Sequence, residues 1–204
     1  MAKQMAFYLN AGACVGCKAC MIACKDKNAL PVEINFRHIV QYEGGSWMFR
    51  DGFAIPCNVF GYSISLSCMH CQEPACVENC PTGASFKRED GVVLIDEEQC
   101  IGCRYCEWAC PYGARHYNEA THTMTKCSFC QDLLAKGENP ACVDACVMRA
   151  LDFGDLSELR AKYGLVNAIE PLPSADVTRP SWVVTPHPDA ARSGQGTGAV
   201  REQI

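Results

Sequence analysis

Cysteines are the residues of this sequence whose type and spacing suggest chemistry. The chain has 17 cysteines in 204 residues, and all but Cys57 fall into four groups of four. The first and third groups are spaced C-x2-C-x2-C-x3-C, the second has two more residues in its middle gap, and the fourth has an eleven-residue gap there. Along the chain, the groups are Cys14, Cys17, Cys20 and Cys24; Cys68, Cys71, Cys76 and Cys80; Cys100, Cys103, Cys106 and Cys110; and Cys127, Cys130, Cys142 and Cys146.

This spacing is typical of iron–sulfur proteins. Three cysteines at positions n, n+3 and n+6 lie on one tight loop that can bind three iron atoms of a cubane. In such a run the fourth cysteine ligates the other cluster of a pair, so two runs make one two-cluster module and four runs make two. Thiolates are soft donors that suit iron–sulfur cores. The groups therefore predict [4Fe–4S] clusters bound through all sixteen of these cysteines.

The same cysteines allow two other interpretations. Cys-x2-Cys pairs also occur in zinc sites, which would make the chain a zinc-binding interaction module, but zinc sites draw two cysteines from each of two knuckles. The cysteine content of a little over 8% approaches that of disulfide scaffolds, yet those are mostly secreted chains of under about 80 residues. Zinc without acid-labile sulfide would refute the iron–sulfur interpretation.

Composition and motifs exclude several functions. The formal charge of −5 and the absence of a basic cluster argue against nucleic-acid binding. No stretch approaches the roughly 18 apolar residues of a membrane span, and residues 1–8 lack the apolar run of a signal peptide. No dinucleotide-binding motif, P-loop, haem-attachment motif or nucleophile–base combination occurs. We expect a soluble chain, made in a reducing compartment, that carries electrons and catalyses no reaction itself.

Some residues near the groups could tune the clusters. A cubane with four thiolates carries a charge of about −2, so a nearby cation should raise its potential. Five basic residues are close to predicted ligands in the sequence: Lys18, Lys25, Arg104, Lys126 and Arg149. Any one of them could equally be an ordinary solvated surface charge. Arg104, which lies between two predicted ligands, is the first to test. We expect His70 to support the ligands or lie at the surface rather than bind iron.

Two further expectations concern apolar side chains. Cys57 should be a buried apolar thiol. Aromatic residues near the groups should pack in the core and shield the clusters from water; they are Trp47, Trp108, Tyr105, Tyr112 and Tyr117.

Turn and strand signals place elements between the groups. Residues 84–96, with Gly91 at the turn, predict a β-hairpin, and residues 36–49, with a turn at 43–45, predict another. Residues 59–66 could form a strand. Residues 155–163 predict a short amphipathic helix with Gly164 as its C-cap. From Glu170 the chain is proline-rich and without periodicity, so we expect it to lie extended against the rest or to be partly mobile.

Five strings of the sequence carry a resemblance to a known family. They are C-I-G-C-R-Y-C at 100–106, C-P-Y-G-A at 110–114, A-L-D-F-G at 150–154, S-C-M-H-C at 67–71 and K-R-E-D-G at 87–91. Together they resemble the iron–sulfur subunit of the dimethyl sulfoxide reductase family. The resemblance extends from about Phe7 to the proline-rich tail and includes all four cysteine groups in order.

The resemblance implies a function and a ligand assignment. Such a subunit relays electrons from a membrane anchor subunit that handles quinol to a catalytic subunit with a molybdopterin cofactor. The implied ligands of four [4Fe–4S] clusters, from the catalytic subunit to the membrane, are Cys14, Cys17, Cys20 and Cys146 (cluster 1); Cys24, Cys127, Cys130 and Cys142 (cluster 2); Cys68, Cys71, Cys76 and Cys110 (cluster 3); and Cys80, Cys100, Cys103 and Cys106 (cluster 4). Linker lengths alone leave the pairing open, because 19 residues separate groups two and three and 16 separate groups three and four.

The implied fold is α+β, with two bacterial-ferredoxin-like modules related by pseudo-symmetry, a β-hairpin insertion and an extended C-terminal tail. Residues 1–24 and 111–164 would form the first module, and residues 68–110 the second. Residues 25–67 would be the β-rich insertion, and residues 165–204 the proline-rich tail.

Three positions compare informatively with the family pattern. Cys24 is followed by Lys25 and Cys146 by Val147, where many such runs have proline. Position 103 is cysteine, whereas related nitrate reductase subunits have tryptophan there and a [3Fe–4S] cluster. All four clusters are therefore expected to be [4Fe–4S].

An alternative is a four-cluster subunit of a formate dehydrogenase or hydrogenase complex. The closest formate dehydrogenase subunits carry a membrane-spanning C-terminus, whereas this tail is proline-rich and polar. The resemblance also implies export in the folded state with a partner that bears a twin-arginine signal. We expect a peripheral position on the outer face of the cytoplasmic membrane, with the cytoplasmic face as the alternative.

Overall fold

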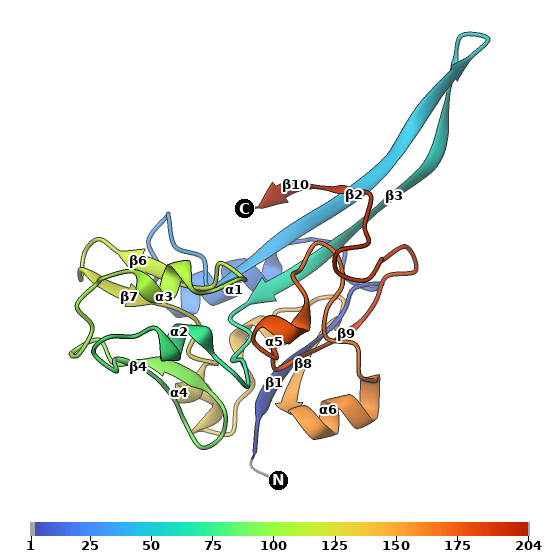
Figure 1. The fold of residues 1–204 in the computed structure, drawn as a ribbon. Coiled ribbons are helices and arrows are strands. Elements are labelled where there is room, and N and C mark those ends of the chain that lie inside the picture. Colours follow the sequence, from blue (N-terminus) through green and yellow to red (C-terminus); the bar gives the residue numbers. More distant parts are fainter. Residues whose placement is uncertain (1–2, 204) are drawn as a thin grey trace.

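The computed structural model describes residues 3–203; Met1, Ala2 and Ile204, which the predicted first module and tail include, lie outside the described residues. Its elements in chain order are β1 (Met5–Asn10), α1 (Ala19–Lys27), β2 (Arg37–Arg50), β3 (Phe53–Ser67), α2 (Ala75–Glu78), β4 (Ser85–Lys87), β5 (Val93–Ile95), α3 (Tyr105–Trp108), β6 (His116–Asn118), β7 (Thr123–Thr125), α4 (Gln131–Leu134), α5 (Ala141–Asp144), β8 (Leu151–Asp155), α6 (Leu156–Tyr163), the 3-10 turn η1 (Ala175–Val177), β9 (Trp182–Thr185) and β10 (Ala199–Gln203). This mixture of short helices and small sheets confirms the α+β class (Figure 1).

Strand β1 is the centre of the fold. It pairs antiparallel with β8 and parallel with β9. Both faces of β1 are buried: Phe7 and Leu9 face the main core, whereas Ala6 and Tyr8 pack against α6. An apolar strand of this kind can only lie between two layers, because its side chains alternate between the two faces of the sheet. The main core also contains many of the group cysteines, so the candidate ligands are built into the interior.

A long β2–β3 hairpin extends away from the rest of the molecule (Figure 1). The predicted turn at residues 43–45 is wrong, because residues 37–50 form one strand with an irregularity between Gly44 and Ser46. Asp51 and Gly52 make the turn instead, with φ of 52° and 84°, as expected for the Asp-Gly turn that best connects antiparallel strands. Gly45, with φ of 104°, accommodates the irregularity within β2. The predicted strand at 59–66 is the inner part of β3.

Similar elements recur beside the cysteine groups. The short helices α2, α3 and α5 each end two residues before the last cysteine of their group. The third residue after that cysteine has a positive φ in all three cases: 72° at Gly83, 60° at Gly113 and 51° at Arg149. Two-stranded hairpins follow the second and third groups, namely β4–β5 and β6–β7; β4–β5 lies where the sequence predicts a hairpin.

The C-terminal part of the chain is more ordered than its composition indicates. The predicted helix at 155–163 is α6, with Asp155 as N-cap and Gly164 after its last residue. The tail does lie against the rest of the molecule, as predicted, but two of its segments are strands that the sequence analysis did not predict. Strand β9 completes the central sheet beside β1, and β10 pairs with β2. Burial of Trp182 and Val183 holds β9 in place.

Candidate iron–sulfur sites

The loops of the first and third groups have the same backbone geometry. Gly16 and Lys18 have φ of 67° and 64°, and the equivalent Gly102 and Arg104 have φ of 66° and 65°. Glycine is required at position 102 because a Cβ there would lie 2.3 Å from the carbonyl oxygen of His122. Each loop leads directly into a helix, α1 or α3. The left-handed residues turn the backbone between successive cysteines, which lets the thiols of one group share a site.

The cluster 1 set, Cys14, Cys17, Cys20 and Cys146, lines one small cavity. Burial, with smaller contributions from Cys20, Cys146 and Cys17, raises the pKa of Cys14. The backbone N–H of Ala150 donates to Cys146 Sγ at 3.3 Å. Four thiols around one cavity are a donor set that fits an iron–sulfur cluster.

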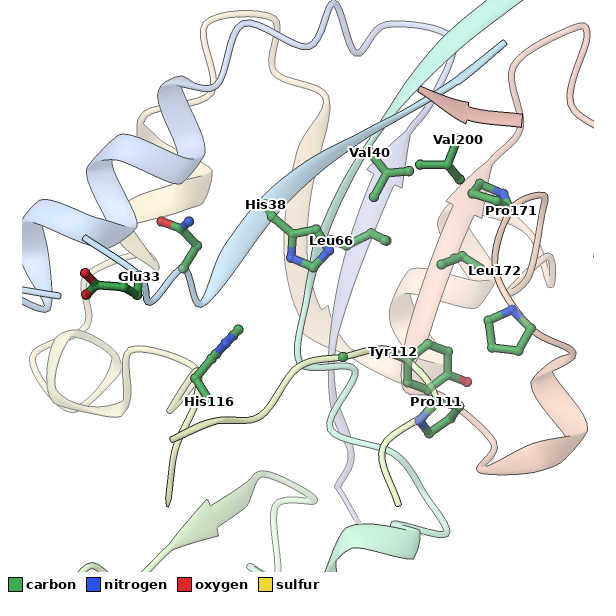
Figure 2. A pocket seen from close by; sticks show the side chains of 13 residues that line it. Glu33, His38, Val40, Leu66, Pro111, Tyr112, His116, Pro171, Leu172 and Val200 are labelled. Carbon is green, nitrogen blue, oxygen red and sulfur yellow. The ribbon is translucent and has the colours of Figure 1, made fainter. Parts of the chain in front are cut away.

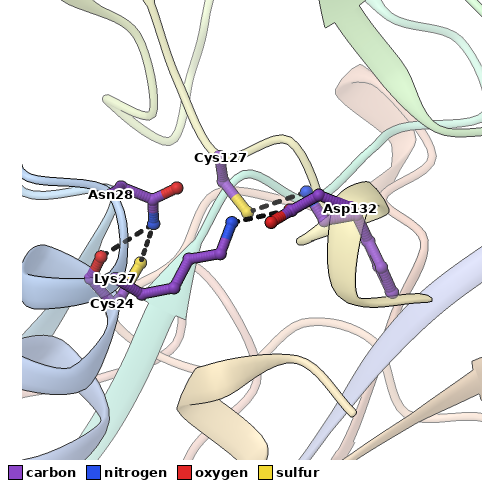
Figure 3. Close-up of polar contacts among 6 residues, drawn as sticks. Cys24, Lys27, Asn28, Cys127 and Asp132 are labelled. Carbon is purple, nitrogen blue, oxygen red and sulfur yellow. Dashed lines mark hydrogen bonds and ion pairs between the residues drawn. The ribbon is translucent and has the colours of Figure 1, made fainter. Parts of the chain in front are cut away.

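The cluster 2 set comprises Cys24, Cys127, Cys130 and Cys142. Burial raises the pKa of Cys24 to about 12, and Cys142 and Cys130 contribute to the shift. The side chain of Asn28 donates to Cys24 Sγ at 3.6 Å, and the backbone N–H of Phe129 donates to Cys127 Sγ at 3.4 Å (Figure 3). Beside them the ion pair of Lys27 with Asp132, at 2.6 Å, joins α1 to α4 (Figure 3). Thiols with raised pKa values must lose protons when they bind iron.

The cluster 3 set comprises Cys68, Cys71, Cys76 and Cys110. Burial raises the pKa of Cys71 to about 12, and Cys68, Cys110 and Cys76 add to the shift. Cys68 behaves differently: burial opposes ionisation, but its interactions with His70, Lys126 and Arg115 outweigh it and hold its pKa well below the usual value.

The cluster 4 set comprises Cys80, Cys100, Cys103 and Cys106. Burial raises the pKa of Cys106, and Cys100 is one of the thiols that add to this shift. Around Cys80 burial is the largest single effect and opposes ionisation, but hydrogen bonds from Ser85, Thr82 and Ala84 together outweigh it and lower the pKa of Cys80. The backbone N–H of Met124 donates to Cys100 Sγ at 3.4 Å. Cys103 is half-buried on the loop before α3.

Neighbouring sets also approach one another. Across the sets, Cys20 interacts with Cys142, Cys127 with Cys68 and Cys106 with Cys76. These electrostatic interactions link set 1 to set 2, set 2 to set 3 and set 3 to set 4.

His70 is buried, so the prediction of a surface position is wrong, whereas a supporting position behind the ligands agrees with the structure. Its Nδ1 accepts a hydrogen bond from the Val93 backbone at 3.1 Å, which puts the proton of the neutral ring on Nε2. The His70 ring meets the ring of Phe129 edge-on at 5.1 Å between centroids. Phe129 lies between two cluster 2 cysteines, so this contact lies between sets 2 and 3.

The basic residues near the groups divide into buried and exposed ones. Arg104 forms a surface ion pair with Glu107, at 2.7 Å. The ammonium of Lys25 donates to carbonyl groups of the following loop, including Ile34 at 3.0 Å. Arg149 is exposed, and Lys126 is buried.

Sequence reasoning missed two buried cations, Arg37 and Arg115. A signal existed for Arg37, because it lies near the start of the predicted strand beside Phe36, but a charge in a strand is more often at the surface. For Arg115 the sequence offers no comparable signal.

Two expectations about apolar side chains are wrong. Cys57 is half-buried on the outer part of β3 rather than buried, because the hairpin projects beyond the core. Of the five aromatic residues, Tyr112 is buried as expected and Tyr117 is half-buried, but Trp47, Tyr105 and Trp108 are exposed.

A separate cleft lies between β2, the segment after Cys110 and the tail. Figure 2 shows His38 and His116 on one side and Tyr112, Pro171 and Leu172 on the other. Burial, with the neighbouring His116 and Arg37, lowers the pKa of His38 to about 4, and burial also lowers that of His116. Both rings are therefore held neutral.

Residues 3–203 lack two features that bear on metal and membrane binding. No three His, Cys, Asp or Glu side chains there lie close enough together to hold a single metal ion. None of the helices in that part of the chain is long and apolar enough to cross a membrane.

Sets of thiols built into an α+β core define an iron–sulfur electron-transfer protein. Residues 59–156 match the family of 4Fe-4S dicluster domains. The sequence is 49% identical over 198 residues to the B subunit of anaerobic dimethyl sulfoxide reductase of Escherichia coli (strain K12), covering 97% of this protein and 96% of that one. It is 48% identical over 196 residues to the same subunit of the Haemophilus influenzae reductase, covering 96% of each protein.

A more distant relative is the B subunit of polysulfide reductase of Wolinella succinogenes, at 39% identity over 191 residues, covering 92% of this protein and 96% of the relative. The protein is a member of the family of iron–sulfur subunits of the dimethyl sulfoxide reductase type. The resemblance seen in the sequence is thereby confirmed. The protein is an electron-transfer subunit of an anaerobic reductase and not its catalytic subunit.

Proposed function

We propose that the protein relays electrons through four [4Fe–4S] clusters, from a quinol-handling membrane anchor subunit to a molybdopterin-containing catalytic subunit. The sixteen group cysteines bind the clusters as sets 1 to 4, and each cluster supplies a one-electron redox centre when bound. The observation that supports this proposal is that thiols of successive sets are close enough to act electrostatically on one another, Cys20 with Cys142, Cys127 with Cys68 and Cys76 with Cys106. A linear order of sets is what a relay requires.

Exposed apolar residues at both ends of this series support two partner subunits. Val15, Val147 and Met148 are exposed beside set 1. Ile101, Tyr105 and Trp108 are exposed beside set 4. Apolar clusters of this kind on a protein surface mark interaction sites. We assign the set 1 end to the catalytic subunit and the set 4 end to the membrane anchor, following the family resemblance.

The domain organisation of this proposal follows the pairing of groups. The first module comprises residues 1–24 and 111–164, the second residues 68–110, with the insertion at 25–67 and the tail at 165–204. The short helices and left-handed residues that recur at the ends of groups two, three and four support a pseudo-symmetric relation. The parallel pairing of β9 with β1 adds part of the tail to the first module.

The substrate of the complex belongs to the catalytic partner. The relatives are named for dimethyl sulfoxide, polysulfide and thiosulfate reductases, so we propose that the partner reduces a sulfur compound. We place the complex on the outer face of the cytoplasmic membrane, with this protein as a peripheral subunit exported with a twin-arginine-bearing partner.

Metal analysis of the native complex tests the proposal. Four cubanes require about sixteen iron atoms and sixteen acid-labile sulfides per copy of the protein. Iron and sulfide near twelve or fewer per copy would contradict the cluster number. Zinc without sulfide would contradict the function. Identification of the co-purifying subunits tests the partners, and absence of a molybdenum-containing subunit would contradict their assignment.

A further inference from the structure

Three cations are buried inside the protein near the cysteine sets: Arg37, Arg115 and Lys126 are 2%, 2% and 6% exposed. None of them forms an ion pair with a carboxylate anywhere in residues 3–203. A buried cation without a counter-charge is unfavourable, because it loses its interaction with water and gains no anion in exchange. Such charges are retained where an anion compensates them, and the anions available here are the cysteine sets.

Arg37 lies between sets 1 and 2. Its guanidinium donates to Ser65 Oγ at 3.1 Å and to Ser67 Oγ at 3.0 Å, and Ser65 Oγ lies 3.2 Å from Sγ of Cys20. Burial opposes its charge, but Cys142, Cys20, Cys127 and Cys24 outweigh this and raise the pKa of Arg37. One of these four thiols belongs to set 1 and the other three belong to set 2.

Lys126 lies between sets 2 and 3. It directly precedes Cys127 of set 2, and its ammonium donates to the Cys127 carbonyl at 2.7 Å and to the Val93 carbonyl. The N–H of Val93 in turn donates to His70, which lies between two set 3 cysteines. The Lys126 charge acts on Cys127 of set 2 and on Cys68 and Cys76 of set 3.

Arg115 lies between sets 3 and 4. Its Nη2 donates to Cys76 Sγ at 2.8 Å and to Ser85 Oγ at 2.7 Å. Its charge acts on Cys76 and Cys68 of set 3 and on Cys106 of set 4. Two buried guanidinium atoms, Arg115 Nη1 and Arg37 Nε, have no hydrogen-bond partner within the described part of the chain. Unpaired donors beside thiol sets suit the acceptor atoms of a bound cluster.

We propose that Arg37, Lys126 and Arg115 are fixed buried cations, one at each junction between consecutive clusters. Each cation raises the reduction potentials of the two clusters on either side of it. This inference rests on the proposed function. Adding an electron to a cluster makes its charge more negative, so a nearby cation favours the reduced form. A cation between two clusters also lessens the repulsion that an electron on one cluster exerts on the next. The three residues act on the clusters through their charge and do not bind iron.

The experiment is an EPR-monitored redox titration of the intact complex. Each signal is first assigned by changing one ligand of each set to serine. Arg115→Met should lower the potentials of clusters 3 and 4 only, and Lys126→Met those of clusters 2 and 3 only. We expect a decrease of about tenfold or more in the equilibrium constant for reduction, which is about 59 mV for one electron. Iron and sulfide content should stay at the level of the unchanged complex.

Two matched variants separate buried charge from other effects. Arg104→Met removes a cation that is next to a cluster 4 ligand in sequence but is exposed and paired with Glu107, so all four potentials should stay within the error of the titration. Arg115→Lys keeps the buried charge and should restore the potentials lost in Arg115→Met. If Arg115→Met loses its clusters, retention of clusters and potentials in Arg115→Lys supports the role of the charge.

Three results would overturn the inference. The first is full cluster content with unshifted potentials in Arg115→Met and Lys126→Met. The second is an equal shift of all four clusters, since that would remove the link between each cation and its junction. The third is loss of clusters in Arg115→Lys as well, which would make Arg115 structural. A complex with zinc and no sulfide would instead refute the proposed function, and the inference with it.

Discussion

Cys103 is the single residue that best tests the assignment of set 4. It lies on the loop whose Gly102 and Arg104 have left-handed backbones. Changing Cys103 to serine or alanine removes one of four thiolates and should convert the cluster nearest the membrane to a three-iron form. The new signal should appear in the EPR spectrum of the oxidised complex.

The same substitution at Cys57 is the control for Cys103. Cys57 lies on the projecting hairpin with its thiol near the Ile55 carbonyl, so Cys57→Ser should leave the spectrum unchanged. An unaltered spectrum in the Cys103 variants would contradict the ligand assignment.

His38 makes the stability of the protein depend on pH. Burial lowers its pKa from 6.5 to about 4, so between these values the unfolded state binds more protons than the folded one. Stability therefore falls as the pH decreases through this range. His38→Gln should reduce that loss by up to about 1.4 kcal/mol per pH unit. Denaturation of the complex between pH 7 and pH 5 measures the slope, and an equal slope in both proteins would exclude His38 as the cause.

Among the secondary-structure elements, α6 shows how a helix-capping residue also fixes the helix against the central sheet. Asp155 accepts a hydrogen bond from the backbone N–H of Ser157 at 2.8 Å and another from that of Gln4 at 3.1 Å. The first caps α6 and the second ties the helix to the segment just before β1. Leu156 and Leu159 then cover Ala6 and Tyr8 of β1. One carboxylate therefore orients a helix that covers one face of the central strand.

Removing this cap should destabilise the protein. Asp155→Ala loses a helix cap, at a cost of about 1 kcal/mol, and the midpoint of thermal unfolding should fall by about 2–4 °C. Asp155→Asn keeps an acceptor and should lose less. Loss of cluster absorbance on heating measures the midpoint. Equal midpoints in Asp155→Ala and the unchanged protein would show that the cap has no role in stability.

Considered as a whole, the molecule has two ends that we expect to bind different partners. Trp108 and Tyr105 are 74% and 52% exposed beside set 4, and aromatic side chains often dominate binding energy at interfaces. Trp108→Ser should weaken binding to the membrane anchor by about tenfold or more, corresponding to about 1.4 kcal/mol. Quantitative co-purification of each subunit measures this effect.

A double variant at the set 1 end is the matched control for Trp108→Ser. Val147→Ser with Met148→Ser should weaken binding of the catalytic subunit and leave the membrane anchor bound. Iron content should be unchanged in both variants, because none of these residues is a ligand. Loss of the same partner from both variants would contradict the assignment of the two ends.

Local features of the sequence were sufficient for much of this description. Cysteine spacing indicated an iron–sulfur cofactor, because three cysteines on one loop are a local property of the chain. The strings around residues 100–114 indicated the family for the same reason. The hairpin at 84–96 and the helix at 155–163 were predictable for the same reason. The turn of the long hairpin was misassigned because Gly44-Gly45 and Asp51-Gly52 are both turn signals, and only strand pairing selects between them.

Which charges lie beside the cysteines was decided by the tertiary structure. Arg104 adjoins Cys103 in sequence, yet its side chain points outward to Glu107. Arg115 donates to Cys76, which is 39 positions away, and Arg37, at the start of β2, acts on Cys142 of α5. Proximity in sequence determines the loop that holds a ligand, whereas the electrostatic environment of a buried thiol depends on every element packed around it. For that reason the cysteines could be found from the sequence alone, whereas Arg37 and Arg115, two of the three cations between them, could not.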